Sequence, residues 1–117
     1  MEGTVVDLGK RSATDRVIHE LAHFPIQPGR EEEFEQSMLR AREVVAASPG
    51  FVSIEWWRGV ERPSVYAIHI VWESVEAHVS GFRESPAFDE WKALTRPYFD
   101  GDVSMEHFEP RSEVYSG

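Results

Sequence analysis

The first regular pattern of hydrophobic and polar positions in this chain runs through residues 16–24, RVIHELAHF, where the two kinds of side chain alternate singly or in pairs. The β-branched residues Val17 and Ile18 open the segment, and Pro25 and Pro28 follow it. Alternation, β-branched residues and a closing proline are typical of a strand. We therefore predict one strand of about nine residues here.

A helical pattern replaces the alternation in residues 28–47, PGREEEFEQSMLRAREVVAA. Its hydrophobic residues recur three or four positions apart and form one stripe: Phe34, Met38, Ala41 and Val45. Glutamates occupy positions 31–33 of the first turn, where negative charge complements the helix dipole. The sequence SPG at 48–50 is expected to end this helix.

The remaining segments predict two strands, a second helical region and a last strand. Residues 51–59, FVSIEWWRG, and 64–73, SVYAIHIVWE, flank a turn that contains glycine and proline. The helical region that follows is broken near Gly81 and resumes at Ser85-Pro86, a good cap and first-turn pair. Residues 102–110, DVSMEHFEP, form the last strand. The order β-α-β-β-α-β predicts a ferredoxin-like α+β sandwich, one antiparallel sheet with two helices on one face.

The third strand is hydrophobic on both of its faces. One face presents Tyr66, Ile68, Ile70 and Trp72, and the other presents Val65, Ala67, His69 and Val71. Two helices can cover only one face of the sheet, so the other face is expected to pack on a second sheet. A symmetric homodimer is the simplest way to supply that second sheet.

Composition limits the classes of protein that this chain can represent. Its 117 residues suffice for one domain, which we expect over residues 16–110. We expect residues 1–15 to form a polar leader that is disordered in part, and residues 111–117 to form a solvated tail. Cysteine is absent, which favours a cytoplasmic protein without a disulfide framework. A net charge of −9 makes nucleic acid and membrane surfaces poor partners. Four tryptophans, seven phenylalanines and three tyrosines serve either the core or a pocket for a flat organic ligand.

The string HELAH at residues 19–23 matches the H-E-x-x-H signature of zinc proteases. In those enzymes both histidines lie on a helix, whereas this segment is predicted to be a strand. Histidines four positions apart on a strand are separated by about 13 Å, far more than two Zn–N bonds of roughly 2.0–2.1 Å can span. We therefore reject a zinc site and expect His19 and His23 to be partly buried near a subunit interface; a place in a pocket is the alternative.

Four segments together resemble the antibiotic biosynthesis monooxygenase family, within the dimeric α+β barrel superfamily. They are IQPGREEEFEQ, SPGFVSIEWWRG, IVWESVEAHVSGFRESPAFDEW and MEHFEP, and the resemblance extends over residues 17–110. It implies a homodimer and a small enzyme that oxidises a phenol or hydroquinone of aromatic or polyketide type without metal, haem or flavin. It also implies a substrate pocket between the sheet and the helices of each subunit.

The resemblance assigns individual positions. Trp72 matches the family's tryptophan at the end of the third strand, while His78, Ile68 and Lys92 stand where the family has tyrosine, asparagine and arginine. These three departures leave the monooxygenase assignment open. For Trp72, the alternative is a core residue whose N–H binds backbone.

The resemblance also suggests how a pocket is built around Trp72 and His78. His78 is the candidate base, because an imidazole with a pKa of about 6.5 suits proton transfer near neutral pH; its alternative is a surface histidine of a helix. Tyr66, Ile68 and Phe82 are candidate substrate contacts with Trp72. Arg83 is the candidate for balancing the charge of a phenolate, and a solvated helix charge is its alternative.

Three other functions compete with oxygenation. A cyclase or isomerase would keep the pocket and use His78 to move a proton without dioxygen. A non-catalytic module would bind a small ligand or only dimerise. Related haem-degrading proteins use an asparagine and a later histidine, but this chain has no asparagine and His78 follows Trp72 by too few residues, so haem degradation ranks lower.

Overall fold

The computed structural model describes residues 17–117. The predicted leader, residues 1–15, lies outside the described residues. Within these residues the strands are β2 (Ile18–Pro25), β3 (Phe51–Arg58), β4 (Val65–Trp72) and β5 (Ser104–Phe108). The two α-helices are α1 (Glu31–Ala46) and α2 (Pro86–Thr95), and short helical segments are η1 (Ala77–Phe82) and η2 (Arg96–Tyr98).

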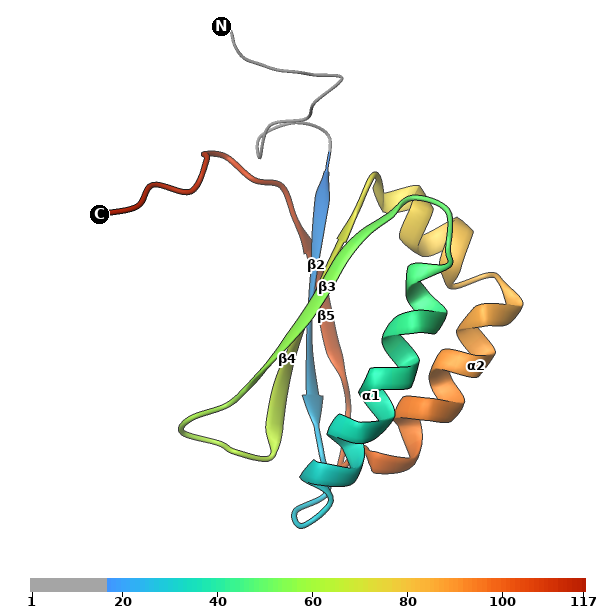
Figure 1. Ribbon diagram of the computed structural model, residues 1–117, viewed down its shortest axis with the longest axis vertical. Helices are drawn as coiled ribbons and strands as arrows, with labels where there is room; N and C mark the ends of the chain where they lie inside the picture. Colours follow the sequence, from blue (N-terminus) through green and yellow to red (C-terminus); the bar gives the residue numbers. More distant parts are fainter. Residues whose placement is uncertain (1–16) are drawn as a thin grey trace, which may run out of the picture.

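The strands form one sheet in the order β3-β4-β2-β5, and each neighbouring pair is antiparallel. Both helices lie on one face of this sheet, and no helix or strand of residues 17–117 covers the other face, which is called the open face below (Figure 1). This arrangement confirms the predicted ferredoxin-like α+β fold. Among the described residues, no helix combines the length and hydrophobicity that crossing a membrane requires.

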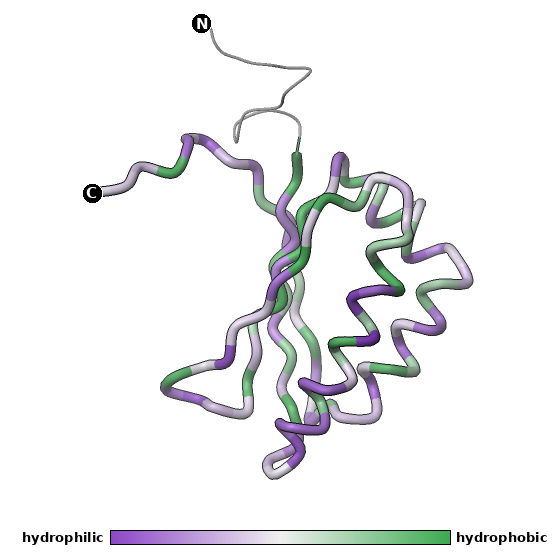
Figure 2. Tube along the Cα trace, viewed as in Figure 1, coloured by the Kyte–Doolittle hydropathy of each residue, from purple (hydrophilic) through white to green (hydrophobic). Residues whose placement is uncertain are grey.

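The predicted stripe of α1 forms the centre of the core. Phe34, Met38, Ala41 and Val45 have no exposed surface, and they pack on the helix-facing residues of β2 and β4. The alternation of hydrophobic and hydrophilic residues along the strands is visible in Figure 2. Because side chains of a strand alternate between its faces, this pattern gives the sheet a helix-covered face and an open face.

The segment between β4 and α2 is interrupted as predicted, and the interruption is a π-helical turn. The backbone N–H of Arg83 donates to the carbonyl of His78 over 2.9 Å, which is the five-residue spacing of a π-helix. Ser74 begins the segment, since its Oγ accepts a hydrogen bond from the N–H of Ala77 at 3.0 Å. This early start turns His78 back over the sheet, and its side chain is only 4% exposed.

A glycine permits the close approach of η1 to the sheet. Gly50 has a φ of +86°, and a Cβ at this position would lie 2.5 Å from the Cβ of Ala77, the first residue of η1. A larger residue would therefore push η1 away from the strand that Gly50 precedes. Gly50 thus helps to set the position of the turn that carries His78.

Candidate active site

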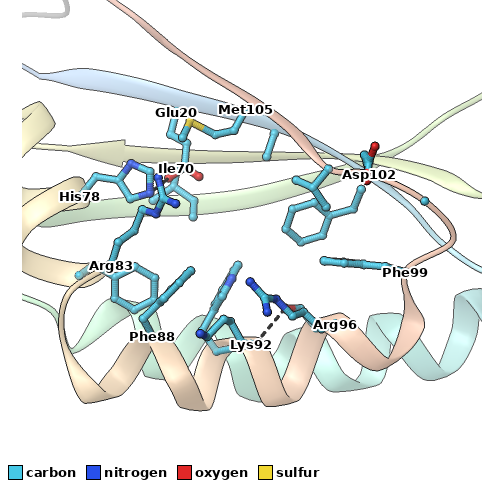
Figure 3. A pocket seen from close by; sticks show the side chains of 17 residues that line it. Glu20, Ile70, His78, Arg83, Phe88, Lys92, Arg96, Phe99, Asp102 and Met105 are labelled. Atoms are coloured by element: carbon cyan, nitrogen blue, oxygen red, sulfur yellow. Dashed lines mark hydrogen bonds and ion pairs between the residues drawn. The ribbon is translucent and has the colours of Figure 1, made fainter.

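A cavity of about 450 Å³ lies between the helix-facing side of the sheet and the segment formed by η1 and α2 (Figure 3). Aromatic side chains form part of its walls, among them Phe82, Phe88, Trp91 and Phe99. Polar side chains of β2 and η1 line one end, which we call the inner end and define by Glu20 and His78. A hydrophobic cavity of this volume with a few polar groups is typical of small-molecule sites.

Trp72 and His78 both contact the same carboxyl oxygen of Glu20. The indole Nε1 of Trp72 donates to Oε1 of Glu20 over 2.9 Å, and Nε2 of His78 lies 3.3 Å from the same oxygen. The His78 ring stacks on Trp72 with 5.3 Å between ring centroids and 19° between planes. Both protein contacts use Oε1, so Oε2 is left for a ligand in the cavity that Glu20 lines.

His107 extends this group towards the edge of the sheet. Nδ1 of His78 lies 2.8 Å from Nε2 of His107, and their rings meet edge to face. β5 is an edge strand, and it places His107 beside Glu20 in the β2–β5 register. His107 is half-buried, whereas Glu20 and His78 are 8% and 4% exposed. The alternation of β5 therefore turns His107 to the helix-covered face.

Burial shifts the acidities of both inner groups towards their uncharged forms. It raises the pKa of Glu20 to about 7, although the Trp72 hydrogen bond and the charge of Arg83 act in the opposite direction. Burial lowers the pKa of His78 to about 4, and the nearby His107 and Arg83 lower it further. Near pH 7 the contact between Glu20 and His78 is therefore a polar contact with a neutral imidazole, and not an ion pair with an imidazolium. Groups with such pKa shifts in a cavity are candidates for acid–base chemistry.

Three cationic side chains also line the cavity: Arg83, Lys92 and Arg96. Arg83 and Lys92 lie over the ring of Phe88, at 5.8 and 5.0 Å from its centroid. Nζ of Lys92 also lies 3.3 Å from a carboxylate oxygen of Asp89. Their positive charge favours an anionic ligand in this protein of net charge −9.

The structure brings four of the six predicted site residues together. His78, Phe82 and Arg83 line the cavity, and Trp72 lies directly behind His78 with no exposed surface. The Trp72 N–H binds the Glu20 carboxyl group, not backbone. The burial of His78 shows that it is not a surface histidine. Arg83 is exposed and still lines the cavity.

Tyr66 and Ile68 lie elsewhere in the core and do not line this cavity. The Tyr66 ring packs on Phe34 of α1 at 4.9 Å between centroids, and its hydroxyl donates to the carboxylate of Glu35. Burial raises the pKa of Tyr66, and the neighbouring Glu35 raises it further. Lys92, which stands where the family has arginine, does line the cavity.

Two members of the site, Glu20 and His107, were not among the residues predicted from the sequence. The sequence did carry a signal for Glu20, because it shares a strand face with Ala22 and Phe24, and a charged residue on a hydrophobic face is unusual. For His107, alternation along the last strand indicates that it shares a face with Val103 and Met105. It does not indicate whether that face is the one covered by the helices.

The histidines of the HELAH string lie on the open face of the sheet, and β2 is a strand as predicted. Nδ1 of His19 lies 2.7 Å from Nε2 of His69, and neither His19 nor His23 lines the cavity. His23 borders a separate depression of about 210 Å³ beside Trp57. No group of three histidine or acidic side chains in residues 17–117 is arranged to hold a metal ion.

Comparison with known proteins identifies the family. The model of the antibiotic biosynthesis monooxygenase family matches residues 17–94, and the chain belongs to this family. The uncharacterized protein YczJ of Bacillus subtilis (strain 168) is 30% identical over 93 residues, which cover 80% of this chain and 98% of YczJ.

Solved structures show the same fold. A crystal structure of a proposed antibiotic biosynthesis monooxygenase from Bordetella bronchiseptica matches with a TM-score of 0.79 and 31% identity, covering 82% of this chain and 98% of that one. SnoaB, a cofactor-independent oxygenase from Streptomyces nogalater, matches with a TM-score of 0.74 and 21% identity, covering 86% and 99%. At that identity the likeness to SnoaB concerns the fold alone.

Proposed function

We propose that this protein is a cofactor-independent monooxygenase that converts a phenolic aromatic compound and dioxygen into a quinone and water. The observation that carries the proposal is the contact of Glu20 with His78 at the inner end of an aromatic-walled cavity. Membership of the antibiotic biosynthesis monooxygenase family supports this class of reaction, as does the cofactor-independent oxygenase activity of SnoaB, which has the same fold.

The cavity suits a flat aromatic ligand that becomes an anion during the reaction. Phe82, Phe88 and Trp91 supply faces and edges for stacking. The cationic groups of Arg83 and Lys92 stabilise a phenolate at the wall of a cavity that is partly open to solvent. The phenolic oxygen is placed at the inner end, within reach of Oε2 of Glu20.

The protein's chemical task is to move protons and to hold the anion. Glu20 takes the phenolic proton at Oε2, because a group with a pKa of about 7 gains and loses protons readily at neutral pH. The phenolate gives one electron to dioxygen, and the two radicals combine to form a peroxide on a ring carbon. The peroxide takes up a proton, its O–O bond breaks, and loss of the proton on that carbon leaves a carbonyl group and water. One phenol and one dioxygen give one quinone and one water, and no external electron donor is consumed.

The experiment is an oxygen-uptake assay with a panel of polycyclic phenols and hydroquinones in buffer that contains a metal chelator. For a phenol substrate we expect one dioxygen consumed per quinone formed, with one oxygen atom of labelled dioxygen in the product. Glu20→Gln keeps the shape of the side chain and is expected to lower kcat by about 10²–10⁴-fold. Glu43→Gln is the matched control, because Glu43 is exposed on α1.

Two outcomes would contradict the proposal. Conversion of the same compounds without dioxygen would instead support a cyclase or isomerase that uses the same acid–base group. Saturable binding with no turnover of any compound would support a ligand-binding module.

A further inference from the structure

We propose, resting on the function proposed above, that Glu20, His78 and His107 form a proton wire between the inner end of the cavity and solvent at the β5 edge of the sheet. His107 is the positioning residue at its outer end. It touches no ligand, since it does not line the cavity, and it acts through His78.

The three side chains are linked by one hydrogen bond, between the two histidines, and by one longer polar contact, between Glu20 and His78. Oε1 of Glu20 lies 3.3 Å from Nε2 of His78, and Nδ1 of His78 lies 2.8 Å from Nε2 of His107. Each imidazole can accept a proton on one nitrogen while it releases one from the other. Glu20 and His78 are nearly inaccessible at 8% and 4%, whereas His107 is half-buried on an edge strand. Of the three, His107 is therefore the group through which protons reach solvent.

The outward transfer starts with a neutral Glu20 carboxyl group. Its Oε2 accepts the phenolic proton while the proton on Oε1 passes to Nε2 of His78. The proton on Nδ1 of His78 passes to Nε2 of His107, and the proton on Nδ1 of His107 passes to water. One proton enters the wire and one leaves, every group in the wire stays neutral, and no electron moves along it.

The inward transfer reverses each step and supplies the proton that the peroxide needs. Outward passage leaves both imidazoles protonated on Nε2, which is the arrangement that inward passage requires. Ionisation of the phenol sends one proton out, and protonation of the peroxide brings one in. One turnover therefore returns both rings to their original tautomers.

Burial of the two inner groups favours this neutral pathway. Burial disfavours both a carboxylate at Glu20 and an imidazolium at His78. The charge of Arg83 acts on both groups: it further disfavours an imidazolium at His78, and at Glu20 it offsets part of the effect of burial by favouring the carboxylate. Trp72 donates to Oε1 of Glu20, and it fixes the carboxyl group beside His78.

The first test needs no substrate. Nitrogen-15 NMR of labelled histidine distinguishes the two tautomers of His78. While Glu20 is a neutral carboxyl group, His78 is expected to carry its proton on Nδ1; once Glu20 is a carboxylate, the proton is expected on Nε2. The switch is expected with a midpoint at about pH 7 and is expected to be absent in Glu20→Gln. A His78 tautomer that stays unchanged between pH 5 and about 9 would overturn the wire, whether or not any phenol is oxidised.

The second test separates proton transfer from simple positioning, using whichever phenol is turned over in the oxygen-uptake assay. His107→Gln retains an amide that can hydrogen-bond Nδ1 of His78, but it cannot pass a proton. We expect kcat to fall about tenfold or more in His107→Gln. We expect added imidazole to restore turnover in His107→Ala, where it can occupy the space of the lost ring. Wild-type turnover in His107→Gln, or no rescue by imidazole, would contradict the wire. If wild-type protein oxidises no phenol, the proposed function fails and the NMR titration alone decides the wire.

Discussion

Trp72 donates a hydrogen bond from its indole nitrogen to the carboxyl group of Glu20, 2.9 Å away, and both residues are buried. Trp72 is the residue that the sequence matches to the family's tryptophan, and Glu20 is the residue whose pKa burial raises to about 7. The tryptophan therefore acts on the cavity through the carboxyl group that it holds, and not through its own surface.

Trp72→Phe is expected to raise the pKa of Glu20 above about 7, because the lost hydrogen bond lowers that pKa in the native protein. Removing the donor should also lower the free energy of unfolding by about 1–3 kcal/mol, since a buried acceptor loses a partner. NMR titration of the labelled glutamate side chain and urea denaturation measure the two effects. Trp91→Phe is the control: Trp91 lines the cavity, so ligand affinity should fall while the pKa of Glu20 stays the same. The reverse pattern would mean that Trp72 contacts the ligand directly.

Glu20→Gln should make the protein more resistant to rising pH. The folded state holds the Glu20 proton up to about pH 7, whereas the unfolded chain releases it near 4.5. Wild-type stability contributed by this group is therefore present below pH 4.5 and declines as the pH rises through about 7. The difference in unfolding free energy, Glu20→Gln minus wild type, should increase by about 3 kcal/mol over that range and then level off. Urea denaturation at a series of pH values gives this difference, and a flat difference would show that Glu20 ionises normally.

Arg83→Gln should raise the pKa values of both Glu20 and His78. The Arg83 charge stabilises the carboxylate and opposes an imidazolium, so its removal favours the protonated form of each group. NMR titration of the two side chains measures the shifts directly. Lys92→Gln is the matched control, because Lys92 also lines the cavity but is paired with Asp89. Equal shifts in both variants would assign the effect to the overall charge of the cavity.

We expect two copies of the chain to pack through the open face of the sheet. That face carries the second hydrophobic side of β4, and Trp57 and Phe108 on its outer strands are each 48% exposed. Stable dimers of this kind typically bury more than about 2,000 Å². Sedimentation equilibrium should give twice the chain mass, and Trp57→Glu should shift the protein towards monomer. Leu39→Glu, on the exposed side of α1, should leave the mass unchanged; a folded wild-type monomer at micromolar concentration would rule out this assembly.

The pattern of hydrophobic residues was enough to place most of the secondary structure. The stripe from Phe34 to Val45 extends over several helical turns, and the pattern in β2 extends over several residue pairs. The predicted bounds of both elements therefore lie within a few residues of the observed ones. The site was harder to predict, because the contact between Glu20 and His78 depends on the π-helical turn after β4. Periodicity indicates which residues of one helix or strand share a face. Which residues of two different elements come into contact also depends on the pairing register of the strands and on where the helical turn lies above the sheet.

β2 supplies Glu20 to the cavity and His19 to the open face from adjacent positions in the chain. A one-residue shift in its pairing with β4 would exchange the two faces, so that a histidine or leucine entered the cavity and the carboxyl group moved to the outer surface. Insertions or deletions within this strand would therefore alter the cavity and the open face together. Substitutions on one face leave the residues of the other face unchanged, so the lining of the cavity and the surface of the open face can vary independently on a strand whose length is fixed.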